Sequence, residues 1–142
     1  MQKGSLLFVY GTLRIGERAD LSKQNAVEFV CEDSINGELY NLGSYPGALV
    51  KPGLFDPSHS SIKGDVFVIR DTAIVPSLDA YEGFPHLYGR LETVTAHDRI
   101  VWVYNYTHII DDSKRILSGD WCLRSPSVPQ SGTQVPNETA GA

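Results

Sequence analysis

The sequence predicts an α+β fold in which a compact mixed β-barrel carries one or two short helices. Two observations support this prediction. Short runs rich in β-branched, aromatic and leucine side chains recur along the chain and end at glycine or polar turns, which is typical of strands. Helical periodicity is sparse, and one stretch near the middle of the chain carries most of it. At 142 residues with 42% hydrophobic residues, the chain is long enough to bury the core of one domain.

The expected strands share the composition of buried or half-buried β-structure. They lie at residues 6–9, 26–31, 35–42, 48–51, 62–69, 87–95 and 100–107. Asp98 and Arg99 separate the last two strands and indicate a hairpin turn. Short strands punctuated by glycine, with one helix inserted between them, favour a closed or nearly closed barrel.

The expected helix lies between the fifth and sixth of these strands. Asp71 and Thr72 offer an N-cap, and Pro76 is compatible only with the first turn. Gly83 and Pro85 supply the stop signals. The helix is therefore short and ends at residue 82.

Composition excludes several classes of function. The formal net charge is −5 and the pI is about 5.2, without a basic run, which argues against sequence-independent binding to nucleic acid. No apolar stretch is long enough to span a bilayer, and the first apolar run is too short for a secretory signal. We therefore expect a cytoplasmic protein with no nucleic-acid or membrane partner, and the oligomeric state stays open.

The chain divides into two parts of different composition. Residues 1–124 are expected to form one domain. Residues 125–142 are dominated by Pro, Ser, Gly, Thr, Asn and Gln, which predicts a disordered tail because such a segment buries little apolar surface.

Cysteine and histidine patterns give no sign of metal or cofactor chemistry. Cys31 and Cys122 are too few and too far apart for a disulfide framework or a zinc site, so two buried thiols are expected. The four histidines lack the spacing of metal ligands. No metal and no cofactor are predicted.

The first candidate site segment is the turn that follows the first apolar run. Tyr10-Gly11-Thr12-Leu13 comes directly after the strand at residues 6–9. Gly11 is expected to take a positive φ and to bring consecutive N–H groups into one concavity, which is suited to a carboxylate. The alternative is a tight turn that only caps a core strand.

The second candidate is Glu82, which falls in the last turn of the expected helix. Unpaired carbonyl groups disfavour an ionised carboxylate there. The neighbouring Leu78, Tyr81 and Phe84 are apolar or aromatic, and burial among them would raise the pKa of the carboxyl toward the range of a proton shuttle. The alternative is an exposed glutamate before a C-capping glycine.

These segments and four further motifs resemble the gamma-glutamylcyclotransferase-like family, which also carries the name AIG2-like. The motifs occur in family order over residues 5 to 123. They are VYGTLR at 9–14, GELYNLG at 37–43 followed by YPGA at 45–48, GDVF at 64–67, LDAYEG at 78–83, YGR at 88–90 and GDW at 119–121.

The resemblance implies a mixed barrel with a cavity at its mouth and a small-molecule γ-glutamyl substrate. The loop from Tyr10 to Leu13 would hold the α-carboxylate end of the γ-glutamyl group, and Glu82 would handle protons. The reaction releases 5-oxoproline and a free amine. Because the α-amine of the substrate attacks its own γ-carbonyl, the enzyme needs no nucleophile. Glu82 would deprotonate this amine and then protonate the leaving amine.

Other residues of the implied site have structural alternatives. Tyr10 and Tyr88 would line the pocket, or would be core aromatics with satisfied hydroxyls. Tyr45 and Phe84 would shape its wall. Arg14 and Arg90 are expected in surface or structural ion pairs rather than on a substrate anion.

Two other hypotheses for the function stay open. One is a non-catalytic module of the same fold that binds a small carboxylate or a protein. The other is a different lyase or amide-cleaving enzyme that uses the same carboxylate on another substrate.

Overall fold

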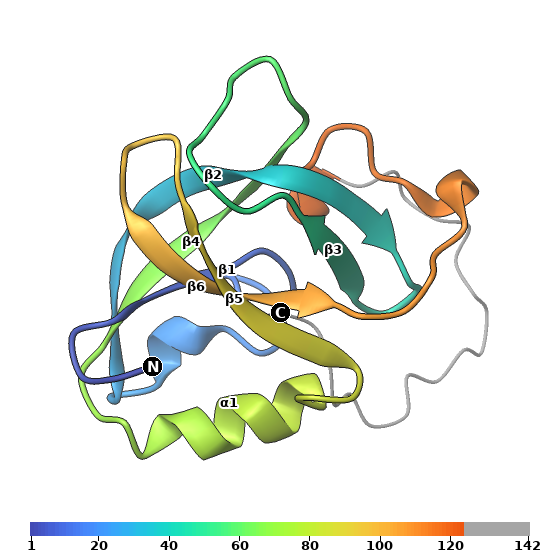
Figure 1. Ribbon diagram of the computed structural model, residues 1–142. Helices are drawn as coiled ribbons and strands as arrows, with labels where there is room; N and C mark the ends of the chain where they lie inside the picture. Colours follow the sequence, from blue (N-terminus) through green and yellow to red (C-terminus); the bar gives the residue numbers. More distant parts are fainter. Residues whose placement is uncertain (124–142) are drawn as a thin grey trace.

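One six-stranded β-sheet and one α-helix form the framework of residues 1–123, the part of the chain that the computed structural model describes (Figure 1). The strands are β1 (Leu6–Val9), β2 (Val27–Asn41), β3 (Pro46–Val50), β4 (Ser61–Ile69), β5 (Tyr88–Val94) and β6 (Ile100–Tyr106). The helix is α1 (Ile74–Glu82), and short 3-10 segments are η1 (Leu21–Lys23), η2 (Asp112–Lys114) and η3 (Trp121–Leu123). The predicted tail at residues 125–142, and the boundary before it, lie outside the described residues.

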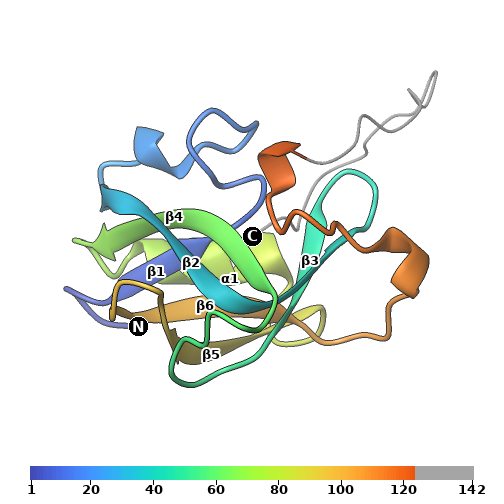
Figure 2. The same ribbon diagram turned by 90° about the horizontal axis from the view of Figure 1, so that it is seen from above.

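The sheet has the strand order β3-β2-β4-β1-β6-β5 and curls into a half-barrel (Figure 2). β1 and β6 pair in parallel, and the other pairings are antiparallel. The curl brings β3 against the other end of the sheet. There the Val50 N–H donates to Asn105 Oδ1 at 2.8 Å, and the Tyr88 hydroxyl donates to the Pro46 carbonyl at 2.6 Å. The mixed barrel-like fold predicted from the sequence is confirmed.

The core surrounds the central strand β1. Leu7, Phe8 and Val9 are all fully buried, so both faces of this strand are covered. α1 lies across the sheet (Figure 1) and buries Leu78 and Glu82, which stand four residues apart on one helical face. The first strand therefore leads directly from the centre of the core into the loop at residue 10.

The separate strands expected at residues 26–31 and 35–42 are wrong, because β2 runs through both. Its register with β4 shifts between Phe29 and Cys31, but the strand continues. The polar segment after Cys31 suggested a break. Asp33 is instead buried, and its carboxylate is bonded by Thr95 Oγ1 at 2.6 Å and by His97 Nδ1 at 2.9 Å. These partners stabilise a polar residue inside a strand.

The predicted stop of α1 and the predicted place of Pro76 in its first turn are confirmed, but the predicted N-cap is wrong. The helix ends at Glu82, and Gly83 follows as a left-handed C-cap with φ 68°. The N-cap is Ala73, which has no side-chain cap. Asp71 Oδ1 instead accepts a hydrogen bond from the Ala73 N–H at 2.9 Å, so the acidic side chain acts two residues before the N-cap.

The two cysteines are more accessible than expected. Cys31 is half-buried beside the register shift of β2, and Cys122 is exposed on η3. The expectation of two buried thiols is wrong because neither position lies on a regular inward-facing row. The neighbouring Trp121 is buried.

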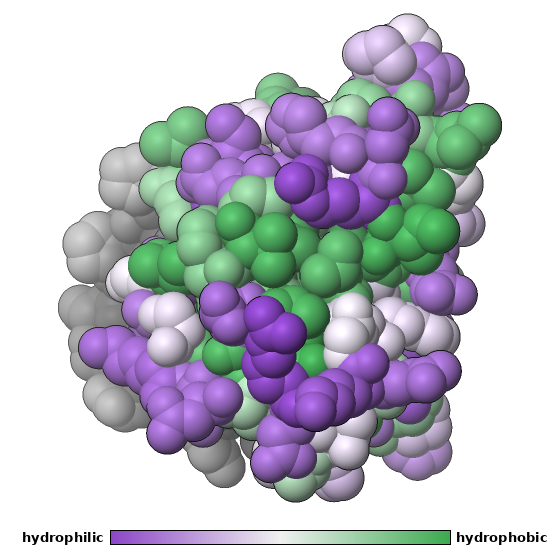
Figure 3. All heavy atoms as spheres, turned by 90° about the vertical axis from the view of Figure 1, so that its left-hand side faces the viewer, coloured by the Kyte–Doolittle hydropathy of each residue, from purple (hydrophilic) through white to green (hydrophobic). Residues whose placement is uncertain are grey.

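The molecular surface is not uniformly polar. Apolar side chains gather in a band on the face shown in Figure 3, with polar side chains above and below it. Phe29 and Val30 of β2 are among the exposed large apolar residues. Apolar atoms form more than half of most protein surfaces, so such a band assigns no function by itself. Within residues 1–123, no helix has both the length and the apolar character to cross a membrane.

Candidate active site

The loop that follows β1 is buried, and hydrogen bonds from the residues that follow it in the chain hold its backbone in place. The carbonyl groups of residues 11–13 accept hydrogen bonds from the N–H groups of Arg14, Ala19 and Leu21 in turn, at 2.9–3.0 Å. Thr12 and Leu13 are at most 4% exposed. The loop is therefore an ordered part of the core and not a surface turn.

The expected conformation of Gly11 is wrong. Its φ lies outside the left-handed region, which seven other glycines of the described chain occupy. The N–H groups of Gly11 and Leu13 nevertheless donate to no acceptor within residues 1–123. Two buried donors in a tight loop are suited to a carboxylate, although they do not form the αL-dependent nest that the sequence suggested.

Glu82 is fully buried at the end of α1, in agreement with its predicted place in the last helical turn. It faces a cluster of three tyrosines, Tyr10, Tyr88 and Tyr104. Burial raises the pKa of each of these hydroxyls, and the nearby charge of Glu82 raises it further. The carboxyl of Glu82 therefore lies in the same buried region as Tyr10, the first residue of the loop.

The hydroxyls of the three tyrosines are satisfied within the protein. Tyr10 donates to the Tyr104 carbonyl at 2.7 Å, and Tyr88 donates to the Pro46 carbonyl. Tyr104 donates to Asp79 Oδ1 at 2.7 Å. Tyr10 and Tyr88 thus match the alternative of core aromatics with bonded hydroxyls.

A hydrogen bond between Thr12 Oγ1 and the Tyr81 hydroxyl, 2.8 Å long, joins the loop to the helix. Tyr81 directly precedes Glu82. Residues separated by 69 positions are therefore brought together, and the loop lies beside the end of α1.

Tyr45 and Phe84 lie at the edge of this region. Both are half-buried, and Tyr45 is close enough to influence the titration of Tyr88. The ring of Phe84 lies 4.4 Å from the Arg90 guanidinium, which also lies 3.6 Å from Asp79 Oδ1 through its Nε. Arg90 is thus in a structural ion pair, as predicted.

Tyr104 and Asp79 were not singled out from the sequence. Tyr104 pairs with Arg90 across β5 and β6, and it lies close enough to Glu82 for that carboxylate to raise the pKa of its hydroxyl. The only sequence signal for this placement is the hairpin turn at Asp98, from which the register of the two strands could be counted.

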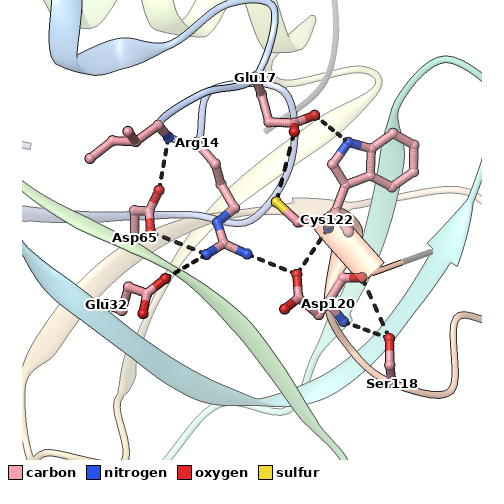
Figure 4. Close-up of polar contacts among 9 residues, drawn as sticks. Arg14, Glu17, Glu32, Asp65, Ser118, Asp120 and Cys122 are labelled. Carbon is pink, nitrogen blue, oxygen red and sulfur yellow. Dashed lines mark hydrogen bonds and ion pairs between the residues drawn. The ribbon is translucent and has the colours of Figure 1, made fainter.

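A buried arginine anchors the end of the loop (Figure 4). Arg14 is 5% exposed, and its Nη1 lies 3.0 Å from Asp120 Oδ1. Its Nη2 lies 3.3 Å from Asp65 Oδ1 and 3.2 Å from Glu32 Oε2. Asp65 Oδ2 also accepts the Ile15 N–H at 2.9 Å. The predicted structural ion pair of Arg14 is confirmed, and it ties the loop to β2, β4 and the segment before η3.

A second contact joins Glu17, which follows the loop, to η3 (Figure 4). Glu17 accepts a hydrogen bond from Trp121 Nε1 at 3.1 Å, and the Cys122 thiol donates to its other oxygen at 3.8 Å. Through Asp120 and Trp121, the motif GDW at residues 119–121 therefore holds the segment that follows the loop in place. No group of three or more His, Cys, Asp or Glu side chains suited to a metal ion occurs within residues 1–123.

Fold and site together define a barrel-like α+β protein with a buried carboxyl beside the loop after its first strand. The family model for gamma-glutamyl cyclotransferase, AIG2-like, matches residues 7–123. The gamma-glutamylcyclotransferase family protein YtfP of Escherichia coli K12 is 35% identical over 119 residues, which cover 83% of this chain and 96% of that protein. The chain belongs to this family.

Solved structures share the fold. The solution structure of Escherichia coli ytfP matches with a TM-score of 0.59 at 32% identity, over 84% of this chain and 97% of that chain. The crystal structure of PH0828 from Pyrococcus horikoshii matches with a TM-score of 0.64 at 23% identity, over 82% and 89%. An AIG2-like protein of the mouse matches with a TM-score of 0.62 at 20% identity, over 80% and 83%.

Proposed function

We propose that this protein is a γ-glutamyl cyclotransferase, which converts a γ-glutamyl amine or γ-glutamyl amino acid into 5-oxoproline and the free amine. One observation carries the proposal. The carboxyl of Glu82 is fully buried beside the loop at residues 10–13, although a helix C-terminus is an unfavourable place for a carboxylate. A buried carboxyl among tyrosines is typical of a group that exchanges protons.

The loop would bind the glutamyl end of the substrate. The N–H groups of Gly11 and Leu13 have no acceptor within the described chain, and an α-carboxylate would supply one to both. Binding there would hold the substrate at one end while its γ-carbonyl lies toward Glu82. The α-amine and the γ-carbonyl would then be close enough for ring closure, and such orientation gives effective molarities of about 10⁵–10⁸ M.

Glu82 would carry the proton transfers. It takes a proton from the α-ammonium, and the freed amine forms a bond to the γ-carbon. Glu82 returns this proton to the leaving nitrogen as the bond between the γ-carbon and that nitrogen breaks. The ring nitrogen then gives up its second proton through Glu82 to the freed amine, so that 5-oxoproline carries a lactam N–H and the amine leaves as an ammonium. No water enters the balance. Full burial of the carboxyl supports this route because it keeps water, the competing nucleophile, away from the γ-carbonyl.

Substitution of Glu82 tests the proposal. Purified wild type is incubated with a γ-glutamyl dipeptide, γ-glutamyl-ε-lysine and glutathione, and 5-oxoproline is measured by mass spectrometry. Glu82→Gln should lower kcat by about 10²–10⁴-fold, because it removes the proton carrier and leaves the shape. Glu92→Gln, on the exposed side of β5, is the matched control and should keep the wild-type rate. A Glu82→Gln variant as active as wild type would refute the assigned role.

A non-catalytic binding module is the alternative. The N–H groups of Gly11 and Leu13, which have no acceptor within the described chain, would bind a small carboxylate whether or not a reaction follows. If no γ-glutamyl compound is turned over but calorimetry detects binding that Glu82→Gln abolishes, this alternative replaces the cyclotransferase.

A further inference from the structure

A pocket of about 320 Å³ lies where β2 and β3 meet the loop at residues 51–60, which joins β3 to β4. Its lining residues are Gly37, Glu38, Leu49, Lys51, His59 and Ser60. In Figure 1 this loop stands at the top of the molecule, and α1 lies at the bottom. The pocket is therefore separate from the candidate active site. Small-molecule sites typically measure about 300–1,000 Å³, so its size suits a small ligand.

Three side chains of this loop form a chain of hydrogen bonds. Lys51 Nζ lies 2.9 Å from His59 Nε2, and His59 Nδ1 lies 3.2 Å from Asp56 Oδ2. An ammonium group only donates, so Nε2 accepts from Lys51, and the ring keeps its proton on Nδ1, where it donates to Asp56. A nucleophile, a base within hydrogen-bond reach and a group that orients the base form the same arrangement in nucleophilic catalysis. Here the nucleophile is a lysine amine.

The protein holds this arrangement in place. Asn36, buried on β2, donates to the carbonyl groups of Asp56 and Ser60 at 2.9 and 3.2 Å and accepts the Asp56 N–H at 2.7 Å. The hydroxyl and the N–H of Ser58 both donate to Asp56 Oδ1. These bonds hold the pKa of Asp56 below its usual value, and nearby positive charge lowers it further. Asp56 therefore stays ionised, and its other oxygen can stabilise an imidazolium at His59.

The partner of Lys51 sets it apart from the other lysines, although its exposure does not. All five lysines of the chain are exposed, and the other four are Lys3, Lys23, Lys63 and Lys114. Among the described residues, Lys51 is the lysine whose amine lies within hydrogen-bond distance of an imidazole. An amine attacks an acyl group only after it has lost a proton, so a base within reach raises its reactivity.

A cation beside the pocket can hold an anionic group of the incoming reagent. Arg115 Nη2 donates to Ser60 Oγ at 2.7 Å, and Arg115 Nη1 lies 3.7 Å from Glu38 Oε2. Both partners line the pocket. Glu38 is already engaged, because its Oε1 accepts the Tyr40 hydroxyl at 2.8 Å. Since the N–H donors of arginine match the oxygens of a phosphate, the pocket is suited to a small reagent that carries both a phosphate and a reactive acyl group.

We propose that Lys51 is a modification site that takes an acyl group from a small acyl phosphate bound in this pocket. His59 takes one proton from the Lys51 ammonium, and the freed amine forms a bond to the acyl carbon. The bond between that carbon and the bridging oxygen of the phosphate breaks, and the nitrogen gives its second proton to the departing phosphate. His59 then releases its proton to solvent, and Lys51 is left as a neutral amide. This modification does not require the proposed cyclotransferase activity.

Acetylation measured separately at each lysine tests the proposal. The full-length protein is incubated with acetyl phosphate, and the remaining amines are then blocked with an isotope-labelled acetylating reagent in denaturant. Mass spectrometry gives the fraction modified at each position. The initial rate at Lys51 should exceed the rates at Lys63 and Lys114 by about 10-fold. A base in an enclosed active site contributes roughly 10²–10⁴-fold, and the smaller effect is expected because the His59 side chain is 39% exposed.

Substitution of the base separates its effect from that of exposure. His59→Gln should lower the rate at Lys51 to that of Lys63, while the other lysines keep their rates. His108→Gln changes an exposed histidine elsewhere and is the matched control, so it should keep the wild-type preference. Equal rates at Lys51, Lys63 and Lys114 in the wild type would overturn the proposal, as would a preference for Lys51 that survives in His59→Gln.

A reagent without charge tests the recognition of phosphate. Arg115→Gln should slow the acetylation of Lys51 by acetyl phosphate by about 2- to 5-fold, because exposed ion pairs are weak. It should leave the reaction with p-nitrophenyl acetate, which carries no phosphate, unchanged. An Arg115→Gln variant that slows both reagents equally, or neither, would show that the pocket does not select an acyl phosphate. Thermal unfolding of each variant checks that folded proteins are compared.

Discussion

At the residue scale, the hydroxyl of Tyr88 has a role that one substitution isolates. It is buried and crosses from β5 to the Pro46 carbonyl of β3. Tyr88→Phe should lower the free energy of unfolding by about 0.5–1.5 kcal/mol, because it removes one buried hydrogen bond and little volume. Urea unfolding followed by fluorescence measures this loss. Tyr45→Phe, at a half-buried tyrosine, is the matched control, and equal losses in both variants would contradict the assignment.

Sequence reasoning at this scale succeeded where the cause is local. The stop signal at Gly83 placed Glu82 in the last turn of the helix, and the aromatic neighbours indicated its burial. It did not reach Tyr104, because the contact of that residue with Asp79 depends on strand register. It also misjudged Gly11, because a glycine permits a positive φ without requiring it.

At the element scale, the Arg14 cluster holds the active-site loop against the sheet and the segment before η3. Arg14→Met should lower the free energy of unfolding by about 3–5 kcal/mol, because Asp65 and Asp120 would stay buried without their cation. Arg70→Met removes the exposed pair with Glu28 and should cost at most about 1 kcal/mol. Urea unfolding compares the two. Similar losses would show that burial of the cluster has no energetic weight.

The C-cap of α1 gives a second prediction at this scale. Gly83 has φ 68°, and an added Cβ would lie 3.0 Å from the Leu87 Cβ. Gly83→Ala should lower the free energy of unfolding by about 1–2 kcal/mol, because non-glycine residues are strained in this conformation. Gly89→Ala is the matched control, since its Cβ would meet only the Thr107 methyl group at 3.7 Å. Thermal unfolding of both variants decides the matter, and a smaller loss at Gly83 than at Gly89 would refute the argument.

Elements were predictable from sequence wherever hydrophobic pattern and turn residues agreed. β4, β5 and β6 match their predicted ranges within a residue or so. β2 did not, because Asp33 lies inside the strand, and its partners Thr95 and His97 are about sixty positions away. A buried polar residue with distant partners cannot be distinguished from a turn residue by local pattern.

At the scale of the whole molecule, Asp33 ties β2 to the hairpin between β5 and β6 and makes stability depend on pH. Burial opposes its ionisation, but hydrogen bonds from Thr95, the Ser34 N–H and His97 outweigh burial and hold its pKa below the usual 3.8. Arg99 also contacts this carboxylate, at 3.3 Å. Because the folded pKa is the lower one, the stabilisation is complete above the unfolded pKa and is lost as pH falls through the folded pKa.

The lowered pKa of Asp33 predicts the acid limb of the stability curve. Wild type should lose unfolding free energy below about pH 4 more steeply than Asp33→Asn, which is less stable at neutral pH but lacks the titrating group. Urea midpoints between pH 2.5 and 7 provide the measurement. Glu92→Gln, at an exposed carboxyl, should follow the wild-type curve. An Asp33→Asn curve parallel to that of the wild type over this range would show that Asp33 does not cause the loss of stability in acid.

A closed or nearly closed barrel was predicted from the glycine-punctuated strands, but the strands that meet to close it were not. The contacts that close it, from Val50 to Asn105 and from Tyr88 to Pro46, join β3 to strands more than forty positions away. A pattern of strands indicates how many can pair and not which edges meet.

The central place of β1 bears on how the polypeptide acquires its structure during synthesis. Its flanking partners are β4 and β6, so residues 6–9 gain their second neighbour only after residue 100 has been made. Long-range pairing of this kind slows folding and leaves apolar strands uncovered in incomplete chains. A nascent fragment that stops before β6 should therefore expose one edge of its most apolar strand, and it is at this stage that chaperones would be needed most.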